Sequence, residues 1–474
     1  MKHTPTIRAE LEKYLKRKGL SKTAFGHISG LNPGTVSGIV TGNKSISVNQ
    51  LDLITLGMEV SPDHFYERYI EECIIEEPLD WRRIGPFLYR CVQFNRLDCL
   101  QKVVSLLLDK LIYPPLLFEV AKDCFEHGYQ EAAAYLYENV SESEKYQHSD
   151  RLATCQYRIF TIQIGDDQKR NLRAATIFEV FVERLDEIDQ LDALKDLANV
   201  YRSLRLWDKV EEMARKMKEK AKLQYSMKHQ QKKREHNESE KKLSSRPMFV
   251  YITYADLLCA SVCEAQGDYQ QALQYTYAYA NLDWVKETDE DTRHWIGLFQ
   301  HWAEGNTYVY ELLSGNTSVL TDYVEYIAAS TNKADEEMVT KLLNVMFAAN
   351  RYQLDVNDIL KRFETVIDSF VQQGQPSSDM YTKQVIPEQF ARFGYELAYY
   401  YLYRGMHSDG FKHLMYAMVS YHTLNNKDYF INCMGLFLHF QDYAVPETKA
   451  ASLNLIEKVW MNNVEKNGTA DHRV

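Results

Sequence analysis

The histidines, cysteines and carboxylates of this 474-residue chain are the side chains that catalysis or metal binding would use. None stands at the spacing of a common motif, since the chain contains no His-Glu-x-x-His, G-x-x-x-x-G-K-[ST], G-x-G-x-x-G or G-x-S-x-G. His294 and His301 flank Trp295 and Trp302 one heptad apart, which is typical of an aromatic packing stripe on a helix. We therefore expect a protein that is not an enzyme and binds no metal or cofactor.

The eight cysteines are scattered and include no Cys-x-x-Cys, so we expect small buried thiols in a reducing cytoplasm. No stretch approaches the ~18 uncharged apolar residues of a membrane span, and the N-terminus lacks the apolar region of a secretory signal. These features predict a cytoplasmic protein with no membrane partner. Glycine and proline total only 31 residues, which favours long helices over tight turns.

Charge is unevenly distributed along the chain. Residues 1–50 carry eight Lys or Arg and two Glu, a balance of +6, and the remainder must carry −17 to reach the total of −11. A basic head on an acidic body is expected when only the head meets phosphate. A solvated basic surface on the first helix would give the same charge pattern.

Capping residues divide the first sixty residues into short helices. Thr6 is expected to cap a helix that ends at Lys18 before Gly19. Ser21 is expected to cap a second helix over 22–29, with Ala24 and Ile28 facing inward.

A third and a fourth helix follow in the same region. Asn32 caps the third, with Pro33 at its first position, where the missing N–H costs nothing. Ser47 and Gln50 form a capping box for the fourth, and Ser61-Pro62 is expected to start another.

The second helix, the turn after it and the short third helix have helix-turn-helix spacing. The run from Ser21 to Gly57 resembles the Cro/lambda-repressor type of DNA-binding domain in Ala24, Gly30, Val36-Ser37, Ile39 and Gly42. The resemblance implies that the third helix offers residues to base edges and that neighbouring residues meet phosphates. The expected DNA-binding residues are Lys22, Asn32, Gly34, Thr35, Ser37, Gly38, Asn43 and Lys44. The alternative is a head that has kept this fold and serves as a docking domain.

The pattern of the body predicts consecutive helix pairs. A short sequence template recurs in these pairs. It consists of an Ala, an aromatic residue or Cys three residues later, and a Gly or a substitute seven residues later. It occurs as Ala121-Cys124-Gly128, Ala198-Tyr201-Arg205, Ala260-Cys263-Gly267 and Ala398-Tyr401-Gly405. In three copies a second small or apolar residue follows twelve positions after the Ala (Val210, Ala272, Gly410), and in the first copy Ala132 comes one position early. Small residues let paired helices cross closely, and the Gly allows the turn between them. Segments 260–280 and 194–217 resemble tetratricopeptide (TPR) repeats, although a generic α-solenoid would share these features.

Two polar breaks interrupt this pattern. Residues 226–248 carry alternating charge and are either a solvated linker or a helix extension, and Gln372 to Pro387 is expected to be a long connection. The predicted organisation is all-α: a helix-turn-helix domain over 1–70, TPR-like repeats over 71–225, the polar segment, and further repeats over 249–474 for ligand binding or dimerisation.

A Cro-type head on a helical-repeat body resembles the peptide-pheromone-responsive regulators of the Rgg/NprR/PlcR/PrgX group and the arbitrium receptors. The resemblance implies a homodimeric transcriptional regulator that binds double-stranded operator DNA. It also implies that a short quorum-sensing peptide binds the concave face of the repeats and changes the DNA-bound state.

Peptide binding needs polar side chains on that concave face, because a buried peptide backbone must keep its hydrogen bonds. Positions three before, one after and four after the template Ala are expected to line the face. The expected peptide-binding residues at these positions are Lys195, Asn199, Arg202, Ser261, Glu264, Tyr395 and Tyr399, and Asn306 is added from a neighbouring helix. Two alternatives remain open: a protein-interaction regulator with a head that does not bind DNA, and a DNA-binding regulator whose repeats only dimerise.

Overall fold

The computed structural model describes residues 5–146, 149–231, 245–329, 335–372, 380–424 and 426–466. Every regular element in these ranges is helical, so the all-α prediction is confirmed for them. The chain forms two compact units. Unit 1 comprises Met1–Gln163 with Val180–Leu185, and unit 2 comprises Ile164–Glu179 with Asp186–Val474.

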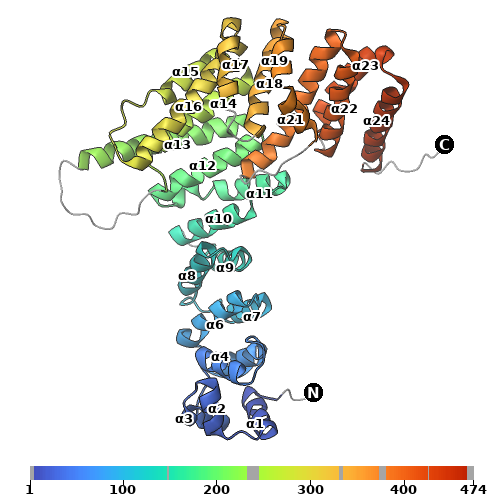
Figure 1. The fold of residues 1–474 in the computed structure, drawn as a ribbon. Helices are drawn as coiled ribbons and strands as arrows, with labels where there is room; N and C mark the ends of the chain where they lie inside the picture. The colour runs from blue at the N-terminus through green and yellow to red at the C-terminus, as the bar shows by residue number, and fades with distance from the viewer. Residues whose placement is uncertain are drawn as a thin grey trace. The chain divides into compact units, whose positions relative to one another are not determined.

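The head of unit 1 begins with four helices, blue in Figure 1, whose ends follow the predicted caps. They are α1 (Ile7–Lys18), α2 (Lys22–Ser29), α3 (Pro33–Val40) and α4 (Val48–Gly57). The side chains of Thr6, Ser21 and Asn32 each accept a hydrogen bond from a backbone N–H of the first turn that they cap. The predicted capping box of Ser47 and Gln50 is also formed. These caps satisfy N–H groups that have no partner within the helix.

The inward face of α2 was predicted wrongly. Ala24 is only half-buried and Ile28 is 58% exposed, whereas Phe25, Gly26 and Ser29 are buried. The reason is the close crossing of α4 over α2: a Cβ atom on Gly57 would lie 2.6 Å from Ser29 Cβ and 2.9 Å from Phe25 Cζ. Packing at this distance selects the face that carries small residues beside one large ring.

The predicted helix start at Ser61-Pro62 is also displaced. Residues 62–65 form a turn, and helix α5 (Tyr66–Tyr69) begins after it and continues as a π-helix, η1 (Ile70–Ile75). The remaining helices of unit 1 are α6 (Trp81–Gln93), α7 (Leu97–Leu107), α8 (Pro114–Glu126), α9 (Gln130–Ser143), α10 (Asp150–Gln163) and the 3-10 turn η2 (Val182–Arg184). One hydrophobic core runs from Ile7 on α1 to Ile159 on α10, so the head shares its core with the helix pairs that follow it.

Unit 2 consists of further helices that pack largely against their neighbours in sequence. Figure 1 shows them in green to red. They are α11 (Gln168–Glu179), α12 (Glu187–Ser203), α13 (Trp207–Gln231), α14 (Met248–Gln266), α15 (Tyr269–Ala280), α16 (Glu290–Leu313), η3 (Thr317–Val319), α17 (Leu320–Ala329), α18 (Asp335–Tyr352), α19 (Asn357–Arg362), α20 (Glu364–Gln372), α21 (Met380–Tyr403), α22 (His407–Thr423), α23 (Lys427–Phe440), η4 (Gln441–Tyr443) and α24 (Pro446–Lys466).

The four copies of the repeat template occupy the same place in four helix pairs. The template Ala is fully buried in each copy, on α8, α12, α14 and α21. The residue seven positions later lies in the turn to the next helix with a positive φ: 81° at Gly128, 59° at Arg205, 78° at Gly267 and 77° at Gly405. The predicted turn is confirmed in all four copies, and in one of them Arg205 adopts the conformation that glycine adopts in the others.

The small residue at the start of each second helix is also buried. Val210 and Ala272 have no exposed surface, and Ala132 is 4% exposed. Gly410 is required by contact, because a Cβ atom there would lie 2.6 Å from Leu402 Cγ. The predicted close crossing within each helix pair is therefore confirmed.

The two polar breaks differ from their predictions in part. Helix α13 continues to Gln231, so the first residues of the 226–248 segment extend a helix, while residues 232–244 lie outside the described residues. The predicted long connection from Gln372 to Pro387 is wrong over its second half. Helix α21 begins at Met380 and includes Pro387, and residues 373–379 are not described.

Helix α14 is the one described helix that has the length and mean hydropathy of a membrane span. It also carries Asp256 and Glu264, and 61% of its apolar window is buried inside the protein. A buried core helix meets the same criteria of length and composition, and α14 packs between α13 and α15 as such a helix does.

Candidate functional site

The turn between α2 and α3 places the N-terminus of α3 at the surface of the head. Gly30 ends α2 in the left-handed conformation, with a φ of 76°. Asn32 Oδ1 accepts a hydrogen bond of 2.8 Å from the backbone N–H of Gly34, so this oxygen acts as the helix cap. Asn32 and Gly34 are exposed, and Thr35 and Ser37 are half-buried. In known helix-turn-helix complexes the start of the second helix reaches base edges, and this role stays a prediction for α3.

The predicted phosphate-binding residues surround this helix. Lys22 is half-buried at the start of α2, and Asn43 and Lys44 are exposed in the turn after α3. A Cβ atom on Gly38 would lie 3.3 Å from Cδ of the exposed Lys44 side chain, so Gly38 lies close to that side chain.

A further basic residue lies beside this turn. Arg8 of α1 donates from Nη2 to the backbone oxygen of Lys44 at 3.3 Å. Sequence reasoning did not select Arg8, although it is one of the eight basic residues of the head. Since it joins α1 to the turn after α3, its position depends on tertiary packing.

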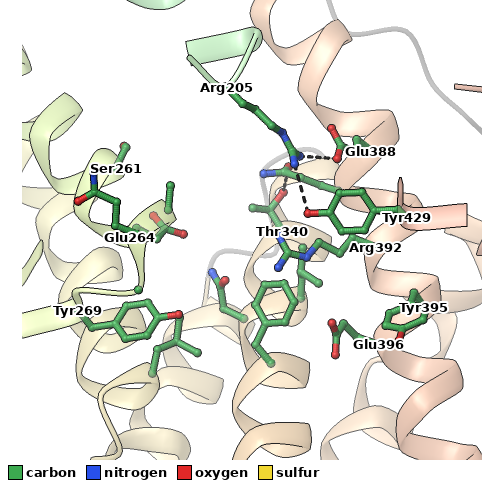
Figure 2. A pocket seen from close by; sticks show the side chains of 18 of the residues that line it. Arg205, Ser261, Glu264, Tyr269, Thr340, Glu388, Arg392, Tyr395, Glu396 and Tyr429 are labelled. Carbon is green, nitrogen blue, oxygen red and sulfur yellow. Dashed lines mark hydrogen bonds and ion pairs between the residues drawn. The ribbon is translucent and has the colours of Figure 1, made fainter. Parts of the chain in front are cut away.

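The second candidate site is a cavity of about 870 Å³ in unit 2, shown in Figure 2. This volume lies within the range of small-molecule and cofactor sites. We call it the central cavity. Five helices and one turn supply the lining residues used below. They are Arg202 on α12, Arg205 in the turn after it, Ser261 and Glu264 on α14, Asn344, Phe347, Asn350 and Arg351 on α18, Glu388, Arg392, Tyr395, Glu396 and Tyr399 on α21, and Tyr429 on α23.

Five of the eight predicted peptide-binding residues line the central cavity. They are Arg202, Ser261, Glu264, Tyr395 and Tyr399, from three different template copies. Helix geometry explains the convergence: residues three before, one after and four after a buried Ala lie along one edge of its helix.

The other three predicted residues lie outside the cavity lining. Lys195 Nζ lies 3.0 Å from Asp196 and 3.4 Å from Asp192. Asn199 Oδ1 accepts a hydrogen bond of 2.5 Å from Tyr254, and Asn306 Nδ2 donates one of 2.7 Å to Tyr279. These residues join neighbouring helices in the structure, and their role toward a peptide stays a prediction.

An ion pair joins two sides of the central cavity. Arg205 Nη2 lies 2.5 Å from Glu388 Oε1, and Arg205 Nη1 donates to the Tyr429 hydroxyl at 3.4 Å. Figure 2 shows both contacts as dashed lines. Arg205 belongs to the turn after α12, so this residue connects that turn to α21 and α23.

Two further carboxylates of the cavity have raised pKa values. The cavity leaves Glu264 accessible to solvent, but the protein that surrounds it disfavours its charged form and raises its pKa. A hydrogen bond of 2.9 Å from Tyr310 acts in the opposite direction. Burial likewise raises the pKa of Glu396, which accepts a 2.7 Å hydrogen bond from Asn350 Nδ2. Both carboxylates thus have donors supplied by the protein.

The charged residues of α21 were missed by sequence reasoning. Glu388, Arg392 and Glu396 lie seven before, three before and one after Tyr395, so they share or adjoin its helix face. Extending the template spacing backward by two helical turns from Tyr395 would have selected Glu388 and Arg392. The sequence has no signal for their partners, which are Arg205 in the turn after α12 for Glu388, and residues of α18 for Arg392 and Glu396.

The histidine and tryptophan pattern of α16 forms the predicted packing stripe. The rings of Trp295 and Trp302 lie 6.2 Å and 5.3 Å from the ring of Phe299, which is fully buried. His301 packs against Tyr326 at 5.7 Å.

No protein-family model matches the chain, and no curated protein matches it. Among solved structures, the chain is similar to PlcR of Bacillus thuringiensis, in a crystal structure with the peptide PapR7 and DNA. The match has 11% sequence identity and a TM-score of 0.23, and it covers 77% of this chain and all of the other. A TM-score this low does not establish a shared fold.

Proposed function

We propose that the protein is a DNA-binding transcriptional regulator whose unit 2 binds a short signalling peptide in the central cavity. The observation that carries the proposal is the convergence of Arg202, Ser261, Glu264, Tyr395 and Tyr399 on one cavity. These residues come from three template copies that span about two hundred positions of sequence. A repeat architecture places equivalent side chains on one surface, and extended peptides use such surfaces.

The lining supplies the groups that a peptide backbone needs. Asn344 and Asn350 each carry one acceptor and two donors, and Tyr395 and Tyr399 add flat apolar area with a polar end. Charged residues of both signs lie between them. A peptide can therefore keep its hydrogen bonds while its side chains leave water, which avoids the cost of burying unpaired polar groups.

The head supports the DNA-binding part of the proposal. Its charge of +6 attracts phosphate, and the turn before α3 leaves the start of that helix exposed. Thr35 and Ser37 offer hydroxyl groups, which discriminate bases less strongly than arginine does. We infer that the protein acts as a cytoplasmic homodimer, because two heads about 34 Å apart would contact successive major-groove faces.

Peptide binding would regulate this dimer through a difference in affinity. A ligand shifts an equilibrium between two forms only as far as it prefers one of them, and a tenfold preference corresponds to about 1.4 kcal/mol. A peptide that binds one arrangement of the helices more tightly would change the population of DNA-bound dimer in response to a secreted signal.

The test is selection of genomic DNA fragments by the purified full chain, with and without spent culture medium of the source organism. We expect a defined sequence to be enriched, and the medium to change its occupancy at least tenfold. The double variant Thr35→Ala with Ser37→Ala should lose the enrichment. The matched control, Ser105→Ala with Thr154→Ala, removes two hydroxyls from an exposed and a half-buried position elsewhere in unit 1 and should keep it.

The other results would favour different functions. Enrichment that spent medium leaves unchanged would support a DNA-binding regulator whose repeats only dimerise. The absence of any enriched sequence at low salt would contradict DNA binding and support a regulator that acts on a protein partner.

A further inference from the structure

Arg392 is a residue of the central cavity whose guanidinium packs on aromatic rings and not on a carboxylate. Its guanidinium lies 4.3 Å from the centre of the Phe347 ring and 5.8 Å from that of Tyr429. The residue is half-buried and lines the central cavity. Its guanidinium forms no hydrogen bond and no ion pair with any residue that the structure describes.

The carboxylates near Arg392 are held by other donors. Glu264 and Glu396 interact electrostatically with Arg392, but the Tyr310 hydroxyl donates to the first and Asn350 donates to the second. Glu388, on the same helix face, pairs with Arg205. Among the described residues, the cavity thus contains three carboxylates with hydrogen-bonding partners and a half-buried guanidinium, that of Arg392, which has none.

Stacking on Phe347 orients the free donors of Arg392. A guanidinium is planar and carries its five N–H groups around its edge, so packing one face on an aromatic ring leaves the edge available. Two parallel N–H groups of that edge match the spacing of a carboxylate. Because the ring already restrains the side chain, binding there costs less conformational entropy than it would with a mobile arginine.

A second unpaired group lies one helical turn from this ring. Asn344 precedes Phe347 by three residues on α18, lines the cavity, and makes no side-chain hydrogen bond with the described residues. Its amide can donate to a carboxylate oxygen or accept from a peptide N–H. Arg351, at the C-terminal end of α18, is exposed and packs over Tyr269 and Tyr352.

We propose that Arg392, stacked on Phe347 and assisted by Asn344, forms a carboxylate-binding subsite of the central cavity. The ligand therefore carries a free carboxylate, either at its C-terminus or on an acidic side chain. This inference rests on the proposed peptide-binding function and adds a chemical requirement for the ligand.

The test uses two synthetic pools of random hexapeptides and the immobilised full chain. The first pool contains Asp and Glu and has free C-termini, whereas the second lacks Asp and Glu and is amidated at the C-terminus. We expect the wild-type chain to retain the first pool at least tenfold more than the second. Arg392→Gln should reduce retention of the first pool to the level of the second, and Arg392→Lys should give an intermediate value because a lysine binds in a single-point manner.

The matched control is Arg215→Gln. Arg215 lies on α13 with its side chain 63% exposed, and it pairs with Glu219 on the surface. Its replacement removes the same charge from the same unit and should leave the retention of both pools within twofold of wild type. If Arg392→Gln fails to fold, the intermediate retention expected of Arg392→Lys still tests the role of Arg392.

A third arm separates the two sources of the carboxylate. Retained peptides are resynthesised with an amidated C-terminus, or with Asp and Glu changed to Asn and Gln. The change that abolishes binding identifies the group bound by Arg392.

Two outcomes would overturn the inference in distinguishable ways. If both pools are retained equally above an albumin control, the carboxylate subsite is wrong and peptide binding stands. If neither pool is retained, the proposed peptide-binding function is wrong, and the subsite is wrong with it.

Discussion

The head and the central cavity both contain many polar side chains, but they use them at different distances along the chain. In the head, Thr6, Ser21 and Ser47 each bond to a backbone N–H three residues away. In the cavity, Asn350 and Glu396 are 46 residues apart, and Arg205 and Tyr429 are 224 residues apart. Hydrogen bonds between residues close in sequence define where helices begin, whereas hydrogen bonds and ion pairs between residues far apart in sequence define how helices pack against one another.

This difference explains what a perturbation should do in each region. The head depends on helix caps and on the apolar core that it shares with the helices after it, so its stability should respond mainly to changes of buried volume. The cavity depends on paired polar groups around an open volume, so it should respond mainly to the loss of a partner. The following predictions test this contrast.

The largest effect is expected from a buried side chain of the head. Ile54→Ala removes a fully buried side chain from α4 and should lower the free energy of unfolding by about 2–5 kcal/mol. Leu56→Ala, two residues away and 67% exposed, should change it by less than about 0.5 kcal/mol. Urea unfolding, with hydrogen exchange of the α4 amides, measures both. Equal losses from the two variants would contradict the packing of α4 described here.

A smaller loss is expected when a long-range partner is removed from the cavity. Asn350→Ala takes away the donor to Glu396 and should cost about 1–3 kcal/mol, because a half-buried carboxylate loses its hydrogen bond. Asn43→Ala in the exposed turn of the head is the control and should cost less than about 0.5 kcal/mol. Hydrogen exchange should become faster in α18 and α21 for the first variant alone. Exchange that stays at the wild-type rate there would show that this pair does not stabilise the cavity.

The turn at Arg205 offers a comparison between backbone strain and a side-chain contact. Arg205 and Gln353 both have positive φ, 59° and 53°, and glycine relieves about 1 kcal/mol of strain at such a position. Gln353→Gly should therefore stabilise unit 2 slightly. Arg205→Gly gains the same relief but loses the pair with Glu388, so it should be less stable than Gln353→Gly by up to about 1 kcal/mol. Thermal unfolding of the two variants side by side would reveal the difference, and a more stable Arg205→Gly would show that the ion pair contributes nothing.

The smallest expected effect concerns the pH dependence of the free energy of unfolding. Asp98 in unit 1 and Glu264 in unit 2 should contribute to it with opposite signs. The hydrogen bond from Arg96 holds the pKa of Asp98 in unit 1 at about 2, so Asp98 stabilises the fold above its unfolded pKa and loses this contribution as the pH falls toward 2. Desolvation by the protein around the cavity raises the pKa of Glu264 in unit 2, so its charged form destabilises the fold and the penalty disappears as the pH falls.

The corresponding variants should show these signs relative to wild type. Asp98→Asn should be less stable at pH 7, by up to about 1 kcal/mol since the carboxylate is more than half exposed, and the gap should close in acid. The free energy of unfolding of Glu264→Gln should increase relative to that of the wild type as the pH rises from 4.5 to 7. Unfolding curves between pH 2 and 7 provide the measurement, and shifts of the same sign in both variants would contradict the assigned environments.

Much of the local structure could be predicted because its causes are local. Caps at Thr6, Ser21, Asn32 and Ser47 act within one helical turn, and each lies where the sequence predicts it. The template Ala residues and the turns after them follow from steric limits within one helix pair. The edge of α12, α14 and α21 that lines the cavity follows from the same periodicity.

The tertiary structure decided what depends on contacts between distant residues. The approach of Gly57 to Phe25 and Ser29 selected the buried face of α2 and left Ile28 exposed, against the apolar pattern. The pairs of Arg205 with Glu388 and of Asn350 with Glu396, and the stacking of Arg392 on Phe347, join residues more than forty positions apart. Sequence periodicity specifies a helix face but not the helix it meets, because that choice is made by the packing of all the helices together.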